Sequence, residues 1–223
     1  MEDLVILNKP AWIFDLDGTL VDSTKQIGDS INFVRNDFGY RELTVGTIKE
    51  LVGLPINHFL QDIGLSQAEE EDMILKFREL LKVEIMGGNQ VFPGVKEFLI
   101  KLNYQEYKLG IATSKPTYLA EMVIKNSSLN DLFHVIQGTE NFPAKPDPTC
   151  IQKAMASLKT KDAIMVGDRT EDIQAANVAG ISSIGIAHSF HNKRDLEEAG
   201  AMHAFDSFLE FTSSVELTQL LID

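Results

Sequence analysis

The sequence has little cysteine, a deficit of basic charge and no long apolar run. Cys150 is the only cysteine in 223 residues, so no intrachain disulfide bond and no multi-cysteine zinc site can form. Lys and Arg number 20 against 33 Asp and Glu, which gives a net charge of −13 at pH 7. We therefore expect no nucleic acid partner, and an anionic ligand has to be held by local charge, a metal or helix N-termini.

Signals for export or membrane insertion are also missing. Residues 1–8 carry Glu2 and Asp3 where a signal peptide would be basic, and the apolar run 4–7 is too short to span a bilayer. A cytoplasmic protein without a membrane partner is therefore expected. The 44% of hydrophobic residues can fill the core of one sizeable domain, or of a domain with an inserted subdomain. No feature of the sequence predicts an oligomeric state.

The most informative stretch is Ala11 to Ser23, where Trp12 to Phe14 predict a buried strand that ends at two carboxylates. Asp15 and Asp17 can converge because residues i and i+2 of a strand share a face, and Gly18 lets the backbone approach a ligand closely. Two converging carboxylates repel each other unless a proton or a cation compensates. The alternative interpretation is a strand end followed by an Asp-Gly turn.

Residues 24–88 have helical periodicity. The first expected helix has an apolar face and ends at Gly39, a short second helix lies around 48–52, and a third follows the capping box Ser66-x-x-Glu69. This block predicts an all-helical insert over residues 21–89. Residues 1–20 and 90–223 are then the α/β core.

Strands and helices alternate from Phe92 onward. Such alternation predicts an α/β fold, a doubly wound, Rossmann-like parallel sheet with helices on both faces, and in this class ligands bind beyond the carboxyl ends of the strands. A terminal helix is expected between Phe208 and Leu221. The expected strands are 109–113, 135–137, 163–166 and 183–186, and the expected helices are 95–103, 117–126, 149–158 and 171–179.

Polar residues that could belong to a ligand-binding site follow two of these strands. The Thr113 hydroxyl and the Ser114 N–H can hold a phosphate before a helix, although an N-cap is the alternative role for Thr113. Lys145 lies among prolines that restrict the backbone on both sides, so we expect its side chain to be held in one direction. A simple proline-rich turn is the alternative.

Two more carboxylates follow the strand 163–166. Asp168 comes directly after Gly167, and Asp172 follows four residues later, where a helix-like turn would direct both to one point. An Asp at a helix start is often only a cap, but here a second acidic strand end matches the first. Together with Asp15 and Asp17 they predict a site rich in oxygen and free of sulfur and histidine, which selects a hard cation such as Mg²⁺.

These signatures resemble those of the haloacid dehalogenase superfamily in order and spacing, and the helical insert resembles its first type of cap domain. The closest resemblance is to the phosphoglycolate-phosphatase-like branch, supported by Phe92-Pro-Gly-Val95 and Glu198-Ala-Gly-Ala201. The four signatures are Asp15-Leu-Asp-Gly-Thr, Thr113 at a strand end, Lys145-Pro-Asp-Pro and Gly167-Asp-Arg-Thr-Glu-Asp172.

The resemblance implies a Mg²⁺-dependent phosphatase that works through an aspartyl-phosphate. It implies that Asp15 is the nucleophile and that Asp17 is the general acid and base. The implied phosphate-binding residues are Asp15, Gly18, Thr113, Ser114 and Lys145. The implied metal ligands are Asp15, the main-chain carbonyl of Asp17 and Asp168, with Asp172 ordering the coordinated waters.

Other activities of the superfamily fit less well. A dehalogenase lacks an acid at the position of Asp17, because a halide leaves unprotonated. Phosphosugar mutases usually carry a His where this chain has Ile27, and phosphonate hydrolysis needs an imine-forming lysine, whereas Lys49 lies on an ordinary polar helix face. A non-catalytic binding module would usually have lost a carboxylate or the lysine, and none is missing.

The substrate is expected to be a small phosphorylated metabolite such as phosphoglycolate, a sugar phosphate, a nucleotide or pyrophosphate.

Arg169 stands where relatives often have Ser, and either contacts an anionic substrate or pairs with Glu171. We expect His58, His188 and His191 to be surface groups and not catalysts. Cap closure is expected to hinge at 20–23 and 87–93. Specificity is expected to depend on residues 51–55 and His58, with Lys25, Arg41 and Lys49 as candidate anion contacts.

Overall fold

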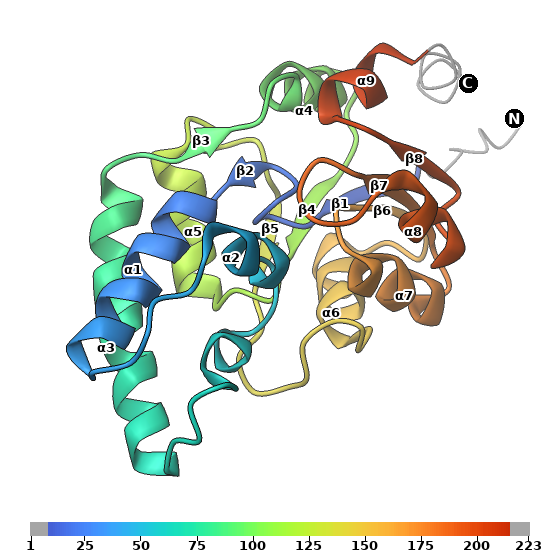
Figure 1. Ribbon diagram of the computed structural model, residues 1–223. Helices are drawn as coiled ribbons and strands as arrows, with labels where there is room; N and C mark the ends of the chain where they lie inside the picture. Colours follow the sequence, from blue (N-terminus) through green and yellow to red (C-terminus); the bar gives the residue numbers. More distant parts are fainter. Residues whose placement is uncertain (1–8, 215–223) are drawn as a thin grey trace, which may run out of the picture.

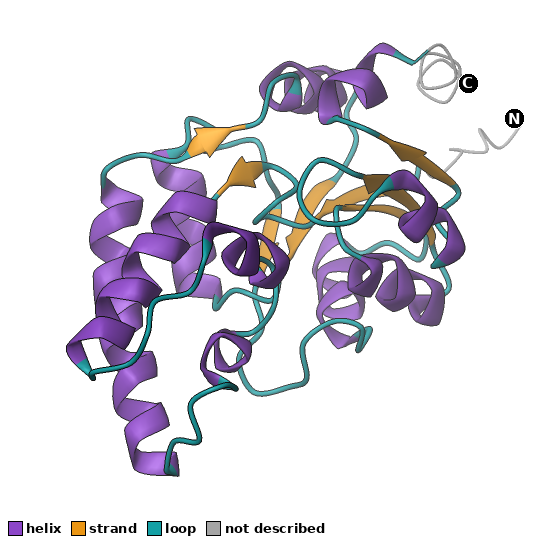
Figure 2. Ribbon diagram, viewed as in Figure 1, coloured by secondary structure: helices purple, strands orange, loops and turns teal. Residues whose placement is uncertain are grey.

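A six-stranded parallel sheet runs through the structure, a computed structural model that describes residues 9–214 (Figure 1). The strand order is β5-β4-β1-β6-β7-β8, with β1 and β6 at the centre. Helices cover both faces (Figure 2), so the predicted doubly wound α/β class is confirmed. The strands are β1 (Ala11–Phe14), β4 (Leu109–Ala112), β5 (Val135–Gln137), β6 (Ala163–Gly167), β7 (Ser182–Ile186) and β8 (His203–Phe205).

The side chains of β1 alternate between two apolar clusters, one on each face of the sheet. Trp12 and Phe14 belong to the larger cluster, where the Trp12 ring lies 5.5 Å from that of Phe98 on α4 (Val95–Tyr104). Ala11 and Ile13 belong to the other cluster, under α6 (Thr149–Leu158) and α7 (Thr170–Ala179). Because both faces are covered, β1 is buried along its whole length, and its carboxyl end is held firmly in place.

The helical insert comprises α1, α2, η1 and α3, and it packs beside the sheet against α5 (Thr117–Asn126) (Figure 1). Its helices are α1 (Thr24–Asp37), α2 (Val45–Leu51), the 3₁₀ helix η1 (Ile56–Leu60) and α3 (Gln67–Met86). The predicted capping box at the start of α3 is present. Where the chain enters and leaves the insert, β2 (Val21–Asp22) and β3 (Gln90–Val91) pair as a small antiparallel sheet. The two connections therefore lie side by side.

The predicted helices and strands of the sheet region all form, with ends that shift by one residue at most. Five short elements were not predicted: β2, β3, η1, α8 (Lys193–Glu198) and β8. The expected terminal helix begins as α9 (Phe208–Ser213), and its remaining part, like the segment 1–8, lies outside the described residues. Among the described residues, no helix has the length and apolar character needed to cross a membrane.

Candidate active site

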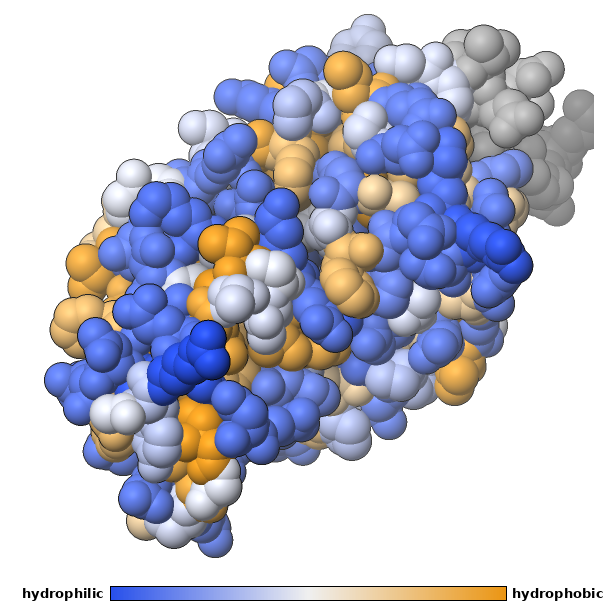
Figure 3. Space-filling model, viewed as in Figure 1, coloured by the Kyte–Doolittle hydropathy of each residue, from blue (hydrophilic) through white to orange (hydrophobic). Residues whose placement is uncertain are grey.

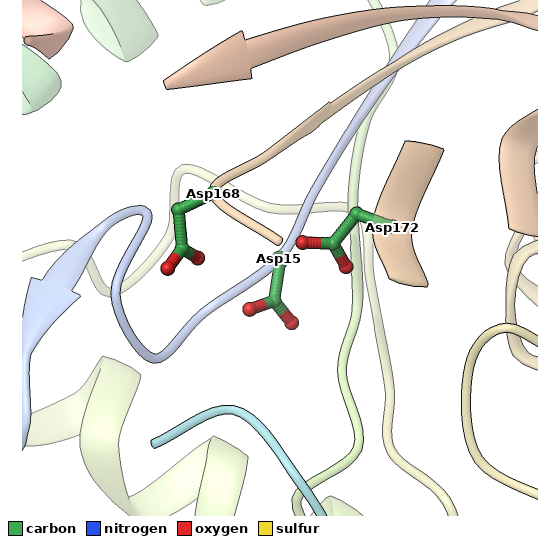
Figure 4. A group of neighbouring side chains, drawn as sticks. All are labelled: Asp15, Asp168 and Asp172. Atoms are coloured by element: carbon green, nitrogen blue, oxygen red, sulfur yellow. The ribbon is translucent and has the colours of Figure 1, made fainter. Parts of the chain in front are cut away.

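Three buried carboxylates converge beyond the carboxyl ends of β1 and β6 (Figure 4). Asp15 follows β1, Asp168 follows β6, and Asp172 lies in the first turn of α7. One oxygen of each lies within 4.8 Å of the others. Because the two strands are parallel neighbours in the sheet, their ends deliver Asp15 and Asp168 to the same edge. The predicted convergence of these three residues is present.

Lys145 inserts its ammonium group among these carboxylates. Its Nζ donates to Asp15 Oδ1 at 2.7 Å, to Asp172 Oδ1 and to the carbonyl of Ala112 at 3.0 Å. The side chain is only 3% exposed. Burial disfavours the charge of Lys145, but the carboxylates of Asp15 and Asp172 outweigh it and raise the lysine pKa. Lys145 is thus fixed in one direction, as its flanking prolines predicted, and is not part of an exposed turn.

Burial raises the pKa of the two strand-end carboxyls far above the ordinary 3.8. The pKa of Asp15 rises to about 7 even though Lys145 opposes the change, and that of Asp168 rises to about 8, with the charge of Asp172 adding to burial. With no cation bound, their stabilising contribution is complete below pH 3.8 and is lost as the pH rises through 7 and 8. The group of three therefore fits a divalent cation, whose charge would compensate the ionised carboxylates.

Asp17 takes no part in this group of three. Its Oδ1 accepts a hydrogen bond from Lys115 Nζ at 2.7 Å and another from the Ser23 hydroxyl. The Asp17 and Lys115 side chains are 5% and 6% exposed. The Asp17 carboxylate is therefore held by a separate partner, and its predicted contribution to a metal site, through the main-chain carbonyl, stays a prediction.

The loop after Asp17 is fitted closely to Asp168. Gly18 has φ +89°, and a side chain there would overlap the Asp168 carboxyl group, so both conformation and space require glycine. The Thr19 hydroxyl donates to Asp168 Oδ1 at 2.8 Å, and the Ser189 hydroxyl donates to Oδ2. These two hydroxyls fix the orientation of the carboxylate.

His188 contacts the same loop. The ring is partly buried, stacks on Phe92 at 3.8 Å and forms a hydrogen bond of 2.7 Å with the Gly18 carbonyl. Burial lowers the pKa of His188. The expectation that His188 is a plain surface group is therefore wrong, because the ring is partly buried and joins the loop after Asp17 to the connection that leaves the helical insert.

Thr113 and Ser114 lie between β4 and α5. Helix α5 begins at Thr117 with Pro116 as its N-cap residue, so the alternative role of Thr113 as the cap is wrong. The Thr113 side chain is buried, and its hydroxyl accepts a hydrogen bond from the Lys115 N–H at 3.3 Å. Ser114 lines a cavity that also includes Asp17. Their predicted role in phosphate binding stays a prediction.

Arg169 connects the sheet edge to the helical insert. Its guanidinium donates to the carbonyls of Glu50 at 2.8 Å and Val52 at 3.0 Å, and its Nε donates to Glu171 at 3.2 Å. A side chain on Gly53, which has φ +89°, would come within 2.7 Å of Arg169 Cδ. Of the two roles considered for Arg169, the structure shows pairing with Glu171, and it adds a contact with the insert that the sequence did not predict.

The chain belongs to the haloacid dehalogenase-like hydrolase family, whose model matches residues 12–186. Within this family it falls in the phosphoglycolate-phosphatase-like branch, as the sequence signatures predicted. The match spans the strand-end residues Asp15 to Asp172, which form the site described above.

Two curated relatives and one solved structure illustrate the similarity. A phosphoglycolate phosphatase of Psychrobacter arcticus is 26% identical over 91% of this chain and 94% of its own length. A 5'-nucleotidase of Pseudomonas aeruginosa is 27% identical over 88% and 91%, respectively. The crystal structure of a predicted phosphatase from Clostridium acetobutylicum is 28% identical, covers 95% of this chain and 99% of its own, and has a TM-score of 0.84.

Several contacts of the site have no signal in the sequence. The role of Lys115 was not predicted although it belongs to the Thr113 segment, and the hydroxyls of Thr19, Ser23 and Ser189 were also missed. None of the predicted anion contacts Lys25, Arg41 and Lys49 lines the cavity, and neither does His58. Lys25 is instead paired with Asp29 at the surface.

We expect Mg²⁺ to raise the melting temperature of the full chain, and more at pH 8 than at pH 6. At pH 6 the carboxyls of Asp15 and Asp168 hold protons that a cation has to displace, because their pKa values are about 7 and about 8. At 100 times its Kd, a cation adds about 2.7 kcal/mol to the free energy of unfolding. Calorimetry with Mg²⁺ and with a chelator measures the difference.

A matched pair of variants tests where the cation binds. Asp168→Asn is expected to abolish the Mg²⁺ shift, whereas Asp162→Asn keeps it, because Asp162 is exposed just before the opposite end of β6. The assignment of the site is contradicted by an Asp168→Asn protein that shows the full shift.

Replacing Arg169 is expected to weaken the attachment of the helical insert. Arg169→Met removes two charge-assisted hydrogen bonds to the Glu50 and Val52 carbonyls, each worth about 1.5–3 kcal/mol when buried. Urea unfolding should show a loss of about 3–6 kcal/mol for the two bonds together. Arg194→Met is the control, since the Arg194 side chain is 84% exposed. Equal losses of stability in the two variants would show that the buried contacts of Arg169 contribute nothing.

Proposed function

We propose that the chain is a Mg²⁺-dependent phosphatase that hydrolyses a small phosphate monoester through an aspartyl-phosphate at Asp15. The observation that carries this proposal is the position of Asp15: it ends β1, contacts Lys145 at 2.7 Å and lies with Asp168 and Asp172 in one buried group. The site thus places a nucleophile beside its countercharge and beside a set of hard oxygen ligands. The relatives named phosphoglycolate phosphatase and 5'-nucleotidase support a small phosphorylated substrate.

In the first half-reaction, an oxygen of Asp15 attacks phosphorus and the ester P–O bond breaks. The leaving oxygen takes a proton from Asp17, which lines the cavity beside the site. Lys115 and the Ser23 hydroxyl hold the Asp17 carboxyl in this position. The products are a free alcohol and a phosphoryl group bound to Asp15.

In the second half-reaction, water hydrolyses the acyl phosphate. Asp17, now ionised, accepts a proton from the water as its oxygen attacks phosphorus, and the bond between phosphorus and the Asp15 oxygen breaks. Asp15 returns as a carboxylate and phosphate leaves. One acid–base residue serves both steps, because the first leaves it in the form that the second requires.

The phosphoryl oxygens are held by Lys145, the Thr113 hydroxyl, and the N–H groups of Ser114 and Gly18. Lys145 already bridges Asp15 and Asp172, so its charge is in place before the substrate arrives. Asp15, Asp168 and the Asp17 carbonyl would hold Mg²⁺, with Asp172 behind them. When bound, Mg²⁺ supplies positive charge that keeps Asp15 ionised and neutralises the phosphoryl oxygens.

The helical insert acts as a cap in this proposal. We assign residues 1–20 and 90–223 to the core and 21–89 to the cap. The paired connections β2 and β3 and the Arg169 contacts with Glu50 and Val52 support this division, because both join the two parts close to Asp15 and Asp17. A cap at this position excludes water from the reacting groups.

The decisive variant is Asp15→Asn. It is expected to lower turnover of a chromogenic phosphate ester by at least about 10⁴-fold, because the amide cannot act as the nucleophile. Circular dichroism should show an unchanged fold. Removing Mg²⁺ with a chelator should stop the wild-type reaction, and adding it back should restore the rate.

Asp29→Asn is the matched control, since Asp29 is an exposed aspartate of α1. It is expected to keep the wild-type rate. Turnover at the wild-type rate in Asp15→Asn would sink the proposal. A sugar phosphate that is isomerised without release of free phosphate would instead identify a mutase.

A further inference from the structure

A cavity of about 320 Å³ lies between the helical insert and the sheet region. Asp17, Ser114 and Lys115 contribute to its wall, so it opens onto the groups that handle the leaving oxygen. Figure 3 shows apolar surface near the middle of the face, at the junction of the two parts. In the proposed reaction, the group that leaves as an alcohol has to occupy this cavity.

The wall of this cavity is mainly apolar. Side chains from α1, η1, α3 and α5 contribute, and the volume reaches the range of sites that enclose drug-sized ligands. A two-carbon acid would leave most of it unfilled, and a sugar would lose water from its hydroxyls with few polar partners in return. The apolar side chains include Ile27, Phe59, Ile74, Phe77, Leu81 and Leu119.

Arg78, on α3, is a cation in this wall that has no counterion within residues 9–214. Among the described residues, no carboxylate oxygen lies within 4.0 Å of its guanidinium, and it forms no hydrogen bond. The neighbouring cations Lys76 and Lys82 pair with Asp37 and Glu79, and the other cation of the cavity, Lys115, pairs with Asp17.

The lack of a salt bridge is informative because, among the described residues, the other Lys and Arg side chains that form none are exposed, where water screens their charge. Arg78 is half-buried and lines the cavity, and its planar guanidinium is suited to a carboxylate or phosphate. Glu140 also lines the cavity, but its carboxylate accepts the Thr117 N–H at 2.8 Å at the start of α5. The partner that Arg78 lacks among the described residues is therefore expected from the ligand.

We propose that the substrate is a phosphate monoester whose leaving group combines an apolar, aromatic or aliphatic body with a second anionic group, and that Arg78 binds this anion. The inference rests on the proposed phosphatase function and adds the substrate class. Arg78 is a specificity-determining residue: it selects the ester by its far end, while Asp15 and Asp17 act on the phosphate.

Two probe esters isolate the second anion: benzyl phosphate and 4-carboxybenzyl phosphate, which differ only by a carboxylate remote from the ester oxygen. The wild-type protein is expected to prefer the carboxylated ester by about tenfold in kcat/KM, the size of one charge-assisted hydrogen bond at a half-exposed site. Arg78→Gln should lower this ratio to about one, and Arg78→Lys should retain part of it.

Arg41→Gln is the matched control. Arg41 is an exposed cation of the helical insert that does not line the cavity, so the ratio should stay at its wild-type value. The inference is overturned if Arg78→Gln leaves the ratio unchanged, or if Arg41→Gln lowers it equally, because general attraction would then explain the preference.

Binding without turnover separates this inference from the proposed function. Calorimetry on Asp15→Asn protein should show tighter binding of 4-carboxybenzyl phosphate than of benzyl phosphate, and the added Arg78→Gln change should remove the difference. If the wild-type protein hydrolyses neither ester but this binding difference is found, the phosphatase proposal fails and the Arg78 site stands. If binding does not depend on Arg78, the inference fails whatever the rates.

Discussion

The concentration of negative charge beyond β1 and β6 is the constraint on which the rest of the structure depends. Asp15, Asp168 and Asp172 lie within 4.8 Å of one another, nearly without access to water, and Lys145 contacts two of them. One ammonium cannot balance three carboxylates. Burial, together with the negative charge that stays unbalanced, therefore raises the pKa of Asp15 and of Asp168. Such a group of buried charges persists only if the surrounding fold enforces its geometry and a bound cation or substrate interacts with it.

The fold imposes it through two apolar clusters. Alternate side chains of β1 are locked into opposite faces of the sheet, and β6 runs parallel beside it in a fixed register. The strand ends therefore cannot separate to relieve the repulsion. Hydrogen bonds from Thr19 and Ser189 then orient Asp168, and the bonds from Lys115 and Ser23 keep Asp17 apart from the group of three. Charge is held in two separate places, which the proposed mechanism assigns to the nucleophile and to the acid.

The sequence predicted the fold and the main site residues because both leave local patterns. Strands and helices of the sheet region have strong periodicity, and Asp15, Asp168 and Lys145 stand at strand ends or between prolines. The pair formed by Lys115 and Asp17 could not be predicted, since it joins residues 98 apart in the sequence and depends on how β1 and β4 align. Arg78 was not singled out in the sequence, and only the packing of the insert brings it to the cavity. The β2 and β3 strands are two residues long, too short to produce an alternating pattern.

A single measurement tests directly whether phosphorus passes through a covalent bond to Asp15, as proposed. Two successive in-line displacements, one by Asp15 and one by water, give net retention of configuration at phosphorus, whereas direct attack by water gives inversion. The measurement is the stereochemical course of hydrolysis by the wild-type protein of a phosphorothioate ester, whose phosphorus is made chiral by sulfur and two oxygen isotopes, in water that carries the third oxygen isotope. Retention is the predicted result, and inversion would contradict the account.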